Sequence, residues 1–285
     1  MRRSILCGLG LALALSTAPA FAQTAPDVNQ TEARSDAEIV VEGRTVNPKD
    51  LPVRVVTPPR PQDRQVSAAS ISDARRFVRC MHSVDPRLLH ETIDRALNDR
   101  TAQWALDRLI RQRSACYSTV FARPPADPPK YGECNPIYGS ALCRNVFDRG
   151  VLFEYALATY APDLTLNRAD LRRDDVRRQF LQRERPISRN RTSDDRRYFD
   201  VVSCVVQTHP EMAVAFIRLA EGDAKEAQLR QLLVGLSSNC FGRAKKVAVD
   251  PNQFRLYVGE AVYSWAAAVR GLDSLIPHAQ QARID

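Results

Sequence analysis

The sequence predicts an all-α protein made of two pseudo-repeated four-helix units, each held by a disulfide, after a disordered N-terminal tether. Three observations lead to this prediction. Two cysteine pairs, Cys80 with Cys116 and Cys204 with Cys240, have the same spacing of 36 residues. Helix signals follow one another from Ser72 onward, and strand signals are nearly absent in that part of the chain.

The first 22 residues are typical of a secretory signal peptide. Arg2 and Arg3 precede an apolar run of about 12 residues, which is too short to span a membrane as a helix. Ala20 and Ala22 then form an A-x-A cleavage pattern. We therefore predict cleavage after Ala22, a periplasmic or secreted mature protein, and no transmembrane segment in the mature chain.

Residues 23–68 are predicted to be a disordered tether, because the segment is rich in proline and polar residues and poor in aromatic ones. A short β-prone run, residues 37–46, lies inside it. We interpret this run as an incidental strand. The alternative is a docking strand that adds to the sheet of an envelope partner.

An internal duplication is indicated when the chain is shifted by 124 positions, which aligns residues 80–116 with residues 204–240. Later, Arg149 and Glu154 align with Arg255 and Glu260 at an offset of 106, so the first copy carries 18 extra residues. The 37 ungapped positions of the first alignment contain eight identities, which are Cys80/Cys204, Pro86/Pro210, Ile93/Ile217, Ala96/Ala220, Asp99/Asp223, Leu109/Leu233, Ser114/Ser238 and Cys116/Cys240.

The duplication selects a disulfide pairing among the 15 connectivities that six cysteines allow. We predict Cys80–Cys116, Cys204–Cys240 and Cys134–Cys143, the last pair lying inside the insertion of the first copy. In an exported protein, each 36-residue loop should add about 3–4 kcal/mol of stability. The alternative, a zinc site, would need short C-x2-4-C spacing, which this sequence lacks.

Each unit is expected to contain four helices. In the first unit, residues 69–166, these cover residues 72–83, a segment that begins at Pro86 behind the N-cap Asp85, a segment that ends near Cys116, and residues 144–159. In the second unit, residues 198–285, we expect helices over residues 199–206, 212–220, 229–236 and 252–270, the last of them after the cap-and-proline pair Asp250-Pro251.

An arginine-rich connector, residues 167–197, joins the two units. It contains 11 arginines and six acidic residues. We interpret it as a solvated helix whose charges pair with one another, and the alternative is a contact with an anionic envelope polymer or lipid head group. Aromatic residues are not interleaved with the arginines, so we expect no nucleic-acid partner.

Motifs for catalysis and cofactor binding are absent from the sequence. It has no G-x-S-x-G elbow, no phosphate-binding glycine loop and no H-E-x-x-H motif. Of the four histidines, His209 precedes a proline at a helix start, where we expect a capping role. We predict no cofactor and no metal site.

Glu154 and Glu260 are the most suggestive polar residues. Their neighbours at i±3 and i±4 are mainly apolar, which places both carboxylates on apolar helix faces. A buried carboxylate must pair with a cation or raise its pKa. We interpret each glutamate as holding an arginine or a helix N-terminus of its own unit. One alternative is that both flank one groove as general acid and base of a glycan hydrolase, and another is that they orient a ligand.

The core pattern of two cysteines around a proline, followed by Arg255, Glu260, Ala261 and Tyr263, resembles a group of uncharacterised exported proteins of sphingomonad-type alphaproteobacteria. The resemblance covers residues 72–270, although the first copy departs from it at Tyr155, which stands in place of Ala261. It implies a helical exported domain, and it carries no known activity and no site residues.

We therefore expect a periplasmic interaction or binding module without catalytic activity. Its expected partner is an unknown envelope protein or an anionic envelope polymer. The alternative function is an envelope-glycan hydrolase that uses Glu154 and Glu260 as its carboxylate pair.

Overall fold

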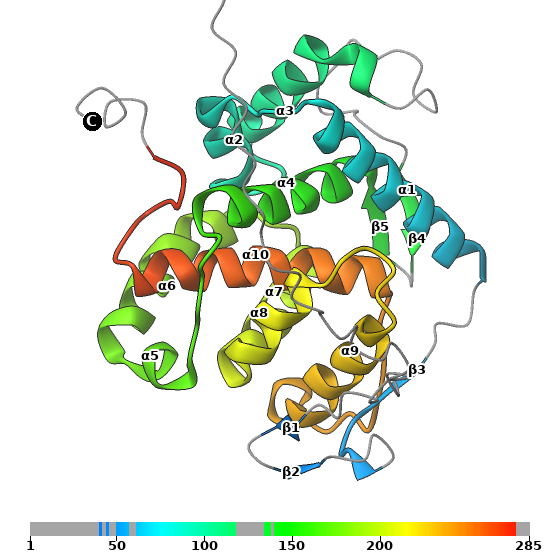
Figure 1. Cartoon of the computed structure of the whole chain (residues 1–285), viewed down its shortest axis with the longest axis vertical. Coiled ribbons are helices and arrows are strands. Elements are labelled where there is room, and N and C mark those ends of the chain that lie inside the picture. The colour runs from blue at the N-terminus through cyan, green and yellow to red at the C-terminus, as the bar shows by residue number, and fades with distance from the viewer. Residues whose placement is uncertain are drawn as a thin grey trace, which may run out of the picture. The chain divides into compact units, whose positions relative to one another are not determined.

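The computed structural model describes residues 40–41, 44–45, 50–56, 61–117, 134–137 and 140–277 (Figure 1). The chain divides into two compact units, residues 1–45 and residues 46–285. In the first unit, β1 (Val40–Val41) pairs antiparallel with β2 (Arg44–Thr45), within the predicted β-prone run. The predicted signal peptide, residues 1–22, lies outside the described residues.

The second unit is helical, which confirms the all-α prediction. Its first half contains α1 (Pro61–Cys80), α2 (Pro86–Ile93), α3 (Arg100–Gln112), the 3-10 helix η2 (Ser114–Cys116) and α4 (Arg144–Tyr160). Its second half repeats this order with α7 (Ser193–Thr208), α8 (Pro210–Arg218), α9 (Lys225–Leu236), the 3-10 helix η5 (Ser238–Phe241) and α10 (Pro251–Val269). The connector forms α5 (Arg168–Arg172) and α6 (Asp174–Arg189).

Two of these helices begin where the cap-and-proline signals predicted. Asp85 accepts hydrogen bonds from the backbone N–H groups of residues 87 and 88 at the start of α2, and Pro86 is the first helical residue. Asp250 accepts a hydrogen bond from the N–H of Gln253 at the start of α10. In both cases the carboxylate satisfies N–H groups that have no partner inside the helix.

Two predicted disulfides are confirmed. Cys80–Cys116 joins the end of α1 to η2, and Cys204–Cys240 joins α7 to η5, with Cα atoms 5.5 and 5.7 Å apart. For the third pair, strands β4 (Cys134–Ile137) and β5 (Ser140–Cys143) form an antiparallel hairpin whose register places the two cysteines directly opposite each other. The side chains of these strands are not described, so the third bridge stays a prediction.

The boundary between the expected tether and the helical part differs from the structure. Helix α1 begins at Pro61, earlier than the predicted start at Ser72, because a proline is well suited to the first turn of a helix. Strand β3 (Arg54–Val56) pairs in parallel with β6 (Lys246–Ala248). Beside this strand, Leu51 is buried against Gly235 of α9, where a Cβ atom would lie 2.5 Å from the leucine Cδ1. Residues 50–56 are therefore packed against the second half.

Helix α10 is the centre of the second unit, with α1, α4, α6, α7 and α8 packed around it (Figure 1). It is buried from residue 253 to residue 268. Helices α4 and α10 lie side by side and run in the same direction (Figure 1). They approach closely at Gly150, where a Cβ atom would lie 2.6 Å from the Leu256 side chain. None of the described helices is both long and apolar enough to cross a membrane.

Candidate functional site

The two candidate glutamates lie between the adjacent helices α4 and α10, and each binds an arginine of the other helix. The Nη1 atom of Arg149 in α4 lies 2.8 Å from Oε1 of Glu260 in α10. Reciprocally, the Nε atom of Arg255 in α10 lies 2.8 Å from Oε1 of Glu154 in α4. The expectation that each glutamate holds a partner of its own unit was therefore wrong for these two bonds, although Glu154 also pairs with Arg75 of α1 at 3.4 Å.

The same two arginines satisfy the free carbonyl groups at the ends of two short helices. Such carbonyls have no N–H partner within their own helix and need one from elsewhere when they are buried. Arg149 donates to the last carbonyls of α2 and Arg255 to those of α8, and the two sets of acceptors are 124 positions apart. They are Thr92, Ile93 and Arg95 for the first arginine, and Phe216, Ile217 and Leu219 for the second.

Glu260 is held in its ionised form by two arginines. Besides Arg149, it accepts a 2.8 Å hydrogen bond from Nη2 of Arg191, a connector residue whose side chain is completely buried. Burial by itself would raise the pKa of Glu260, but the charges and hydrogen bonds of Arg149 and Arg191 outweigh it and lower the pKa to about 2. This carboxylate therefore carries a negative charge at any physiological pH.

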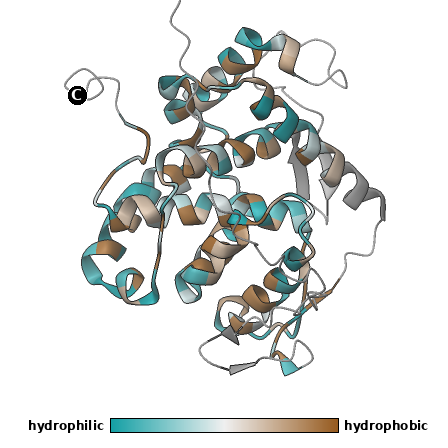
Figure 2. Cartoon of the chain, in the orientation of Figure 1, coloured by the Kyte–Doolittle hydropathy of each residue, from teal (hydrophilic) through white to brown (hydrophobic). Residues whose placement is uncertain are grey.

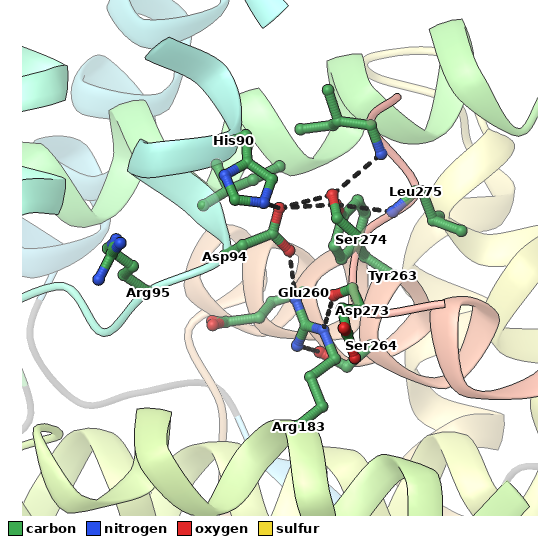
Figure 3. Close-up of polar contacts among 12 residues, drawn as sticks. His90, Asp94, Arg95, Arg183, Glu260, Tyr263, Ser264, Asp273, Ser274 and Leu275 are labelled. Carbon is green, nitrogen blue, oxygen red and sulfur yellow. Dashed lines mark hydrogen bonds and ion pairs between the residues drawn. The ribbon is translucent and has the colours of Figure 1, made fainter. Parts of the chain in front are cut away.

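The ionic contacts continue from Arg191 through the connector. Arg191 lies within 3.5 Å of both Glu184 and Asp195, and Glu184 binds Arg183 at 2.6 Å. Arg183 in turn binds Asp94 at 2.5 Å (Figure 3). The interpretation of the connector as a solvated helix is thus wrong for two of its arginines, because Arg183 and Arg191 are buried and tie α6 and α7 to the core.

Asp94 is the meeting point of several polar side chains at the end of α2 (Figure 3). Its Oδ2 atom accepts hydrogen bonds from the Tyr263 hydroxyl at 3.1 Å and from the Ser274 hydroxyl at 2.8 Å. Burial and the nearby Asp94 charge raise the pKa of Tyr263 well above its usual value. The Nε2 atom of His90 lies 3.8 Å from the same Oδ2 atom, so the serine and the histidine both face this carboxylate.

The surroundings of Glu260 leave little room for a substrate. The side chain is 8% exposed, and the cavity beside it measures about 10 Å³, the space of one water molecule. A carboxylate with a pKa of about 2 has no proton to donate at neutral pH. Glu154 is 17% exposed and bound to two arginines. The arrangement suits structural clamping better than acid–base chemistry. Among the described residues, no group of three His, Cys, Asp or Glu side chains could hold a metal ion.

A hollow of ligand size lies elsewhere, between the α1–α2 loop, the end of α3 and the end of α4. We call it the α1–α2 groove. It consists of two adjoining depressions of about 630 and 410 Å³, within the range of ligand pockets. The larger one is lined by Met81, Ser83, Val84, Asp85, Pro86, Leu109, Gln112, Arg113, Tyr155 and Tyr160, and the smaller continues along the Cys80–Cys116 disulfide.

Tyrosines from α4 form part of the groove wall. The Tyr155 hydroxyl accepts a 3.3 Å hydrogen bond from the N–H of Val84, which connects α4 to the α1–α2 loop. Partial burial raises the pKa of Tyr160, with further contributions from Tyr155 and Asp85. The rings of Tyr155 and Tyr160 are partly exposed, and the Asp85 carboxylate is exposed. The groove therefore combines aromatic surface with a negative charge.

The corresponding place in the second half is covered by α5. Residues 207–209 are the counterparts, at the 124-residue offset, of groove residues 83–85. The Nε atom of Arg168 donates to the Thr208 carbonyl at 2.8 Å, and its Nη2 atom lies 3.0 Å from Nδ1 of His209. The predicted capping role of His209 was wrong, because the residue occupies the N-cap position of α8 but its side chain makes no capping hydrogen bond. Its ring contacts the α5 arginine instead.

The sequence did not reveal the groove or its covered counterpart. The residues that line it come from three separated segments of moderate polarity, and no spacing rule links Ser83, Gln112 and Tyr155. The one available signal was the substitution of Tyr155 for Ala261 between the two copies. Comparisons with protein-family models, with curated proteins and with solved structures find no match for this chain.

Proposed function

We propose that this protein is an exported, non-catalytic helical module that binds its partner in the α1–α2 groove. One observation carries the proposal: the groove is open in the described part of the first half, whereas the chain's own α5 covers the corresponding place in the second half. Two disulfides support an oxidising compartment outside the cytoplasm, since cytosolic proteins rarely keep them. We place the protein in the periplasm, as the N-terminal signal pattern suggests.

We infer that the two halves are copies of one ancestral unit. Support comes from the equal order of elements in the two halves and from the two disulfides with the same 36-residue spacing. Further support comes from the two arginines, whose carbonyl acceptors are offset by 124 positions as in the sequence alignment. If the two halves share one origin, the contacts that α5 makes with the second half indicate what kind of segment the equivalent open groove of the first half can bind.

The contacts of α5 suggest a polypeptide segment with a cation and an apolar residue three positions later, as in Arg168 and Leu171. Arg168 binds the carbonyl and ring of residues 208 and 209. The Leu171 side chain is fully buried, and its carbonyl accepts a hydrogen bond from Gln207. In the first half, the exposed carboxylate of Asp85 replaces the histidine and offers a stronger partner for a guanidinium. Arg113, which also lines the groove, suits an acidic residue of the same segment.

The alternative, a glycan hydrolase, receives less support. A retaining or inverting mechanism needs one carboxyl group that is protonated near neutral pH and a cleft that admits the sugar. Glu260 has a pKa of about 2 and adjoins a cavity of about 10 Å³. We therefore assign Glu154 and Glu260 a structural role.

A labelled peptide with the sequence of residues 166–173 tests the proposed function. We expect saturable binding to the full mature chain in fluorescence polarisation, and loss of binding in Ser83→Trp, which fills the groove from an exposed loop position. The matched control Gln182→Trp, on the exposed side of α6, should bind like the wild type. A peptide with alanine in place of Arg168 should bind at least about tenfold more weakly, since it lacks the charge-assisted bond. Equal binding by wild type and Ser83→Trp, or no binding by either, would contradict the proposal.

A further inference from the structure

Helix α6 presents an exposed row of arginines around a single exposed leucine. Arg177, Leu181, Arg185 and Arg189 are spaced four residues apart and therefore lie on one side of the helix, with Arg178 beside them. All five are exposed, and Leu181, at 60%, has the most exposed side chain among the large apolar residues described. We call this surface the α6 arginine face.

The opposite side of α6 fixes the direction in which this face points. Val176, Phe180 and Ile187 are buried, and the Phe180 ring stacks on Trp265 of α10 with centroids 3.9 Å apart. Hydrophilic and hydrophobic residues alternate along the helices at the left of Figure 2, among them α6. The arginines are thus displayed on a rigid support and not on a freely moving segment.

Within α6, the exposed acid nearest to this face is Asp174 in the first turn, four residues before Arg178, and it offsets only part of the charge. Glu184 is turned inward, where it binds Arg183, and Asp175 in the first turn pairs with Arg173. In the part of the chain that the structure describes, the guanidinium groups of Arg177, Arg178, Arg185 and Arg189 make no hydrogen bond or ion pair. Four arginines therefore face the solvent between residue 177 and the end of α6, and they leave a net positive charge on this side of the helix.

We propose that the α6 arginine face docks the protein on an anionic lipid surface. Guanidinium groups bind phosphate oxygens through paired hydrogen bonds, and each basic residue near an anionic membrane adds to the attraction. Leu181, in the middle of the row, supplies an apolar side chain that enters the head-group region. The face has no aromatic residue on which bases could stack and too little apolar area for a stable protein interface. This surface is independent of the α1–α2 groove.

Flotation with vesicles tests the proposal. The mature chain should float with vesicles that contain phosphatidylglycerol and not with vesicles of phosphatidylcholine alone. Binding should weaken steeply between low and high salt, because exposed charges interact over about 8 Å at physiological ionic strength. Each arginine should contribute about fivefold to the affinity. Replacement of all four arginines by glutamine should therefore weaken binding several-hundred-fold and leave helix content unchanged, since the two residues have similar helix propensities.

A control variant with the same net charge separates a local site from general charge. It carries Arg87→Gln, Arg100→Gln, Arg197→Gln and Arg243→Gln, all at exposed positions outside α6. The control should keep most of the affinity. Equal losses in both variants would refute a docking face on α6. Absence of vesicle binding at low salt would refute the lipid surface, and binding to inorganic phosphate or to soluble dextran sulfate without vesicle binding would show that the arginines recognise free or polymeric anions instead.

Discussion

The crossed Arg–Glu pairs hold α4 and α10 together. Replacement of Glu260 by glutamine removes the charge that faces Arg149 and Arg191 and leaves two buried cations poorly compensated. We expect the free energy of unfolding to fall by about 3–5 kcal/mol, as for other broken buried pairs. Urea denaturation followed by circular dichroism measures this. Glu154→Gln is the matched comparison and should cost less, because its side chain is 17% exposed against 8% for Glu260. Equal, small losses would contradict the clamping role.

The pH dependence of the free energy of unfolding also reports on the pairing of Glu260 with its arginines. The pKa of Glu260 is about 2 in the folded protein and 4.5 in its ordinary state. A lowered folded pKa contributes stability that is complete above about pH 4.5 and is lost as the pH falls toward 2. Between about pH 4.5 and pH 2, the free energy of unfolding of the wild type should therefore fall by about 3 kcal/mol more than that of Glu260→Gln. Parallel acid-denaturation curves for the two proteins would show that the carboxylate is not held by the arginines.

Gly150 is required by the close approach of α4 and α10. An alanine there would place a Cβ atom 2.6 Å from the Leu256 side chain, and we expect a loss of about 1–3 kcal/mol from overpacking. The control is Gly259→Ala in α10, whose Cβ atom would meet only Glu154 at 3.9 Å. That change should stabilise the helix by up to about 1 kcal/mol. The midpoints of thermal unfolding of both variants, compared with the wild type, test this prediction. A stabilising Gly150→Ala would contradict the close contact between α4 and α10.

Single residues were predicted well where the physical cause is local. Asp85 and Asp250 cap their helices as the neighbouring prolines indicated, because a cap depends on three or four adjacent residues. The partners of Glu154 and Glu260 were predicted poorly. Spacing along a helix shows which face a carboxylate occupies, but it does not show which other helix covers that face.

At the scale of elements, the insertion of the first half forms a hairpin with its two cysteines opposite each other. We expect a Cys134–Cys143 bridge, because opposite residues of an antiparallel pair lie close enough for a disulfide. Mass mapping of unreduced digests should show three intramolecular bridges and no free thiol in the mature chain. A free Cys134, or a mixed pairing with Cys80, would contradict it.

The elements that the sequence missed depend on distant partners. Strand β3 has only three residues and pairs with β6, about 190 positions away. The sequence around β3 therefore contains no local pattern that predicts the strand. The prolines before α1 indicated a tether, although Pro61 fits the first turn of a helix. The other helices of the two units carry their own caps or apolar stripes, and most lie within four residues of their predicted positions. Helix α7 is the exception, because it begins at Ser193 behind the cap Thr192, six residues before the predicted start at Phe199 and inside the predicted connector.

The whole second unit should unfold as one cooperative body. The crossed ion pairs join the two halves, and α10 is buried along residues 253–268. The variant Trp104→Phe, at a position 48% exposed, leaves Trp265 as the single tryptophan and as a probe of the second half. Its fluorescence and the overall circular dichroism should give the same denaturation midpoint. Separate midpoints would mean that the halves are independent domains.

The central claim is that the first half binds a polypeptide segment in the α1–α2 groove, while the buried glutamates serve only the fold. Chemical-shift mapping of the ¹⁵N-labelled mature chain with the peptide of residues 166–173 tests it most directly. We predict shifts that saturate together and are confined to residues 81–86, 112–116, Tyr155 and Tyr160. Shifts centred on Glu154 and Glu260, or no saturable shifts in the groove, would contradict the claim.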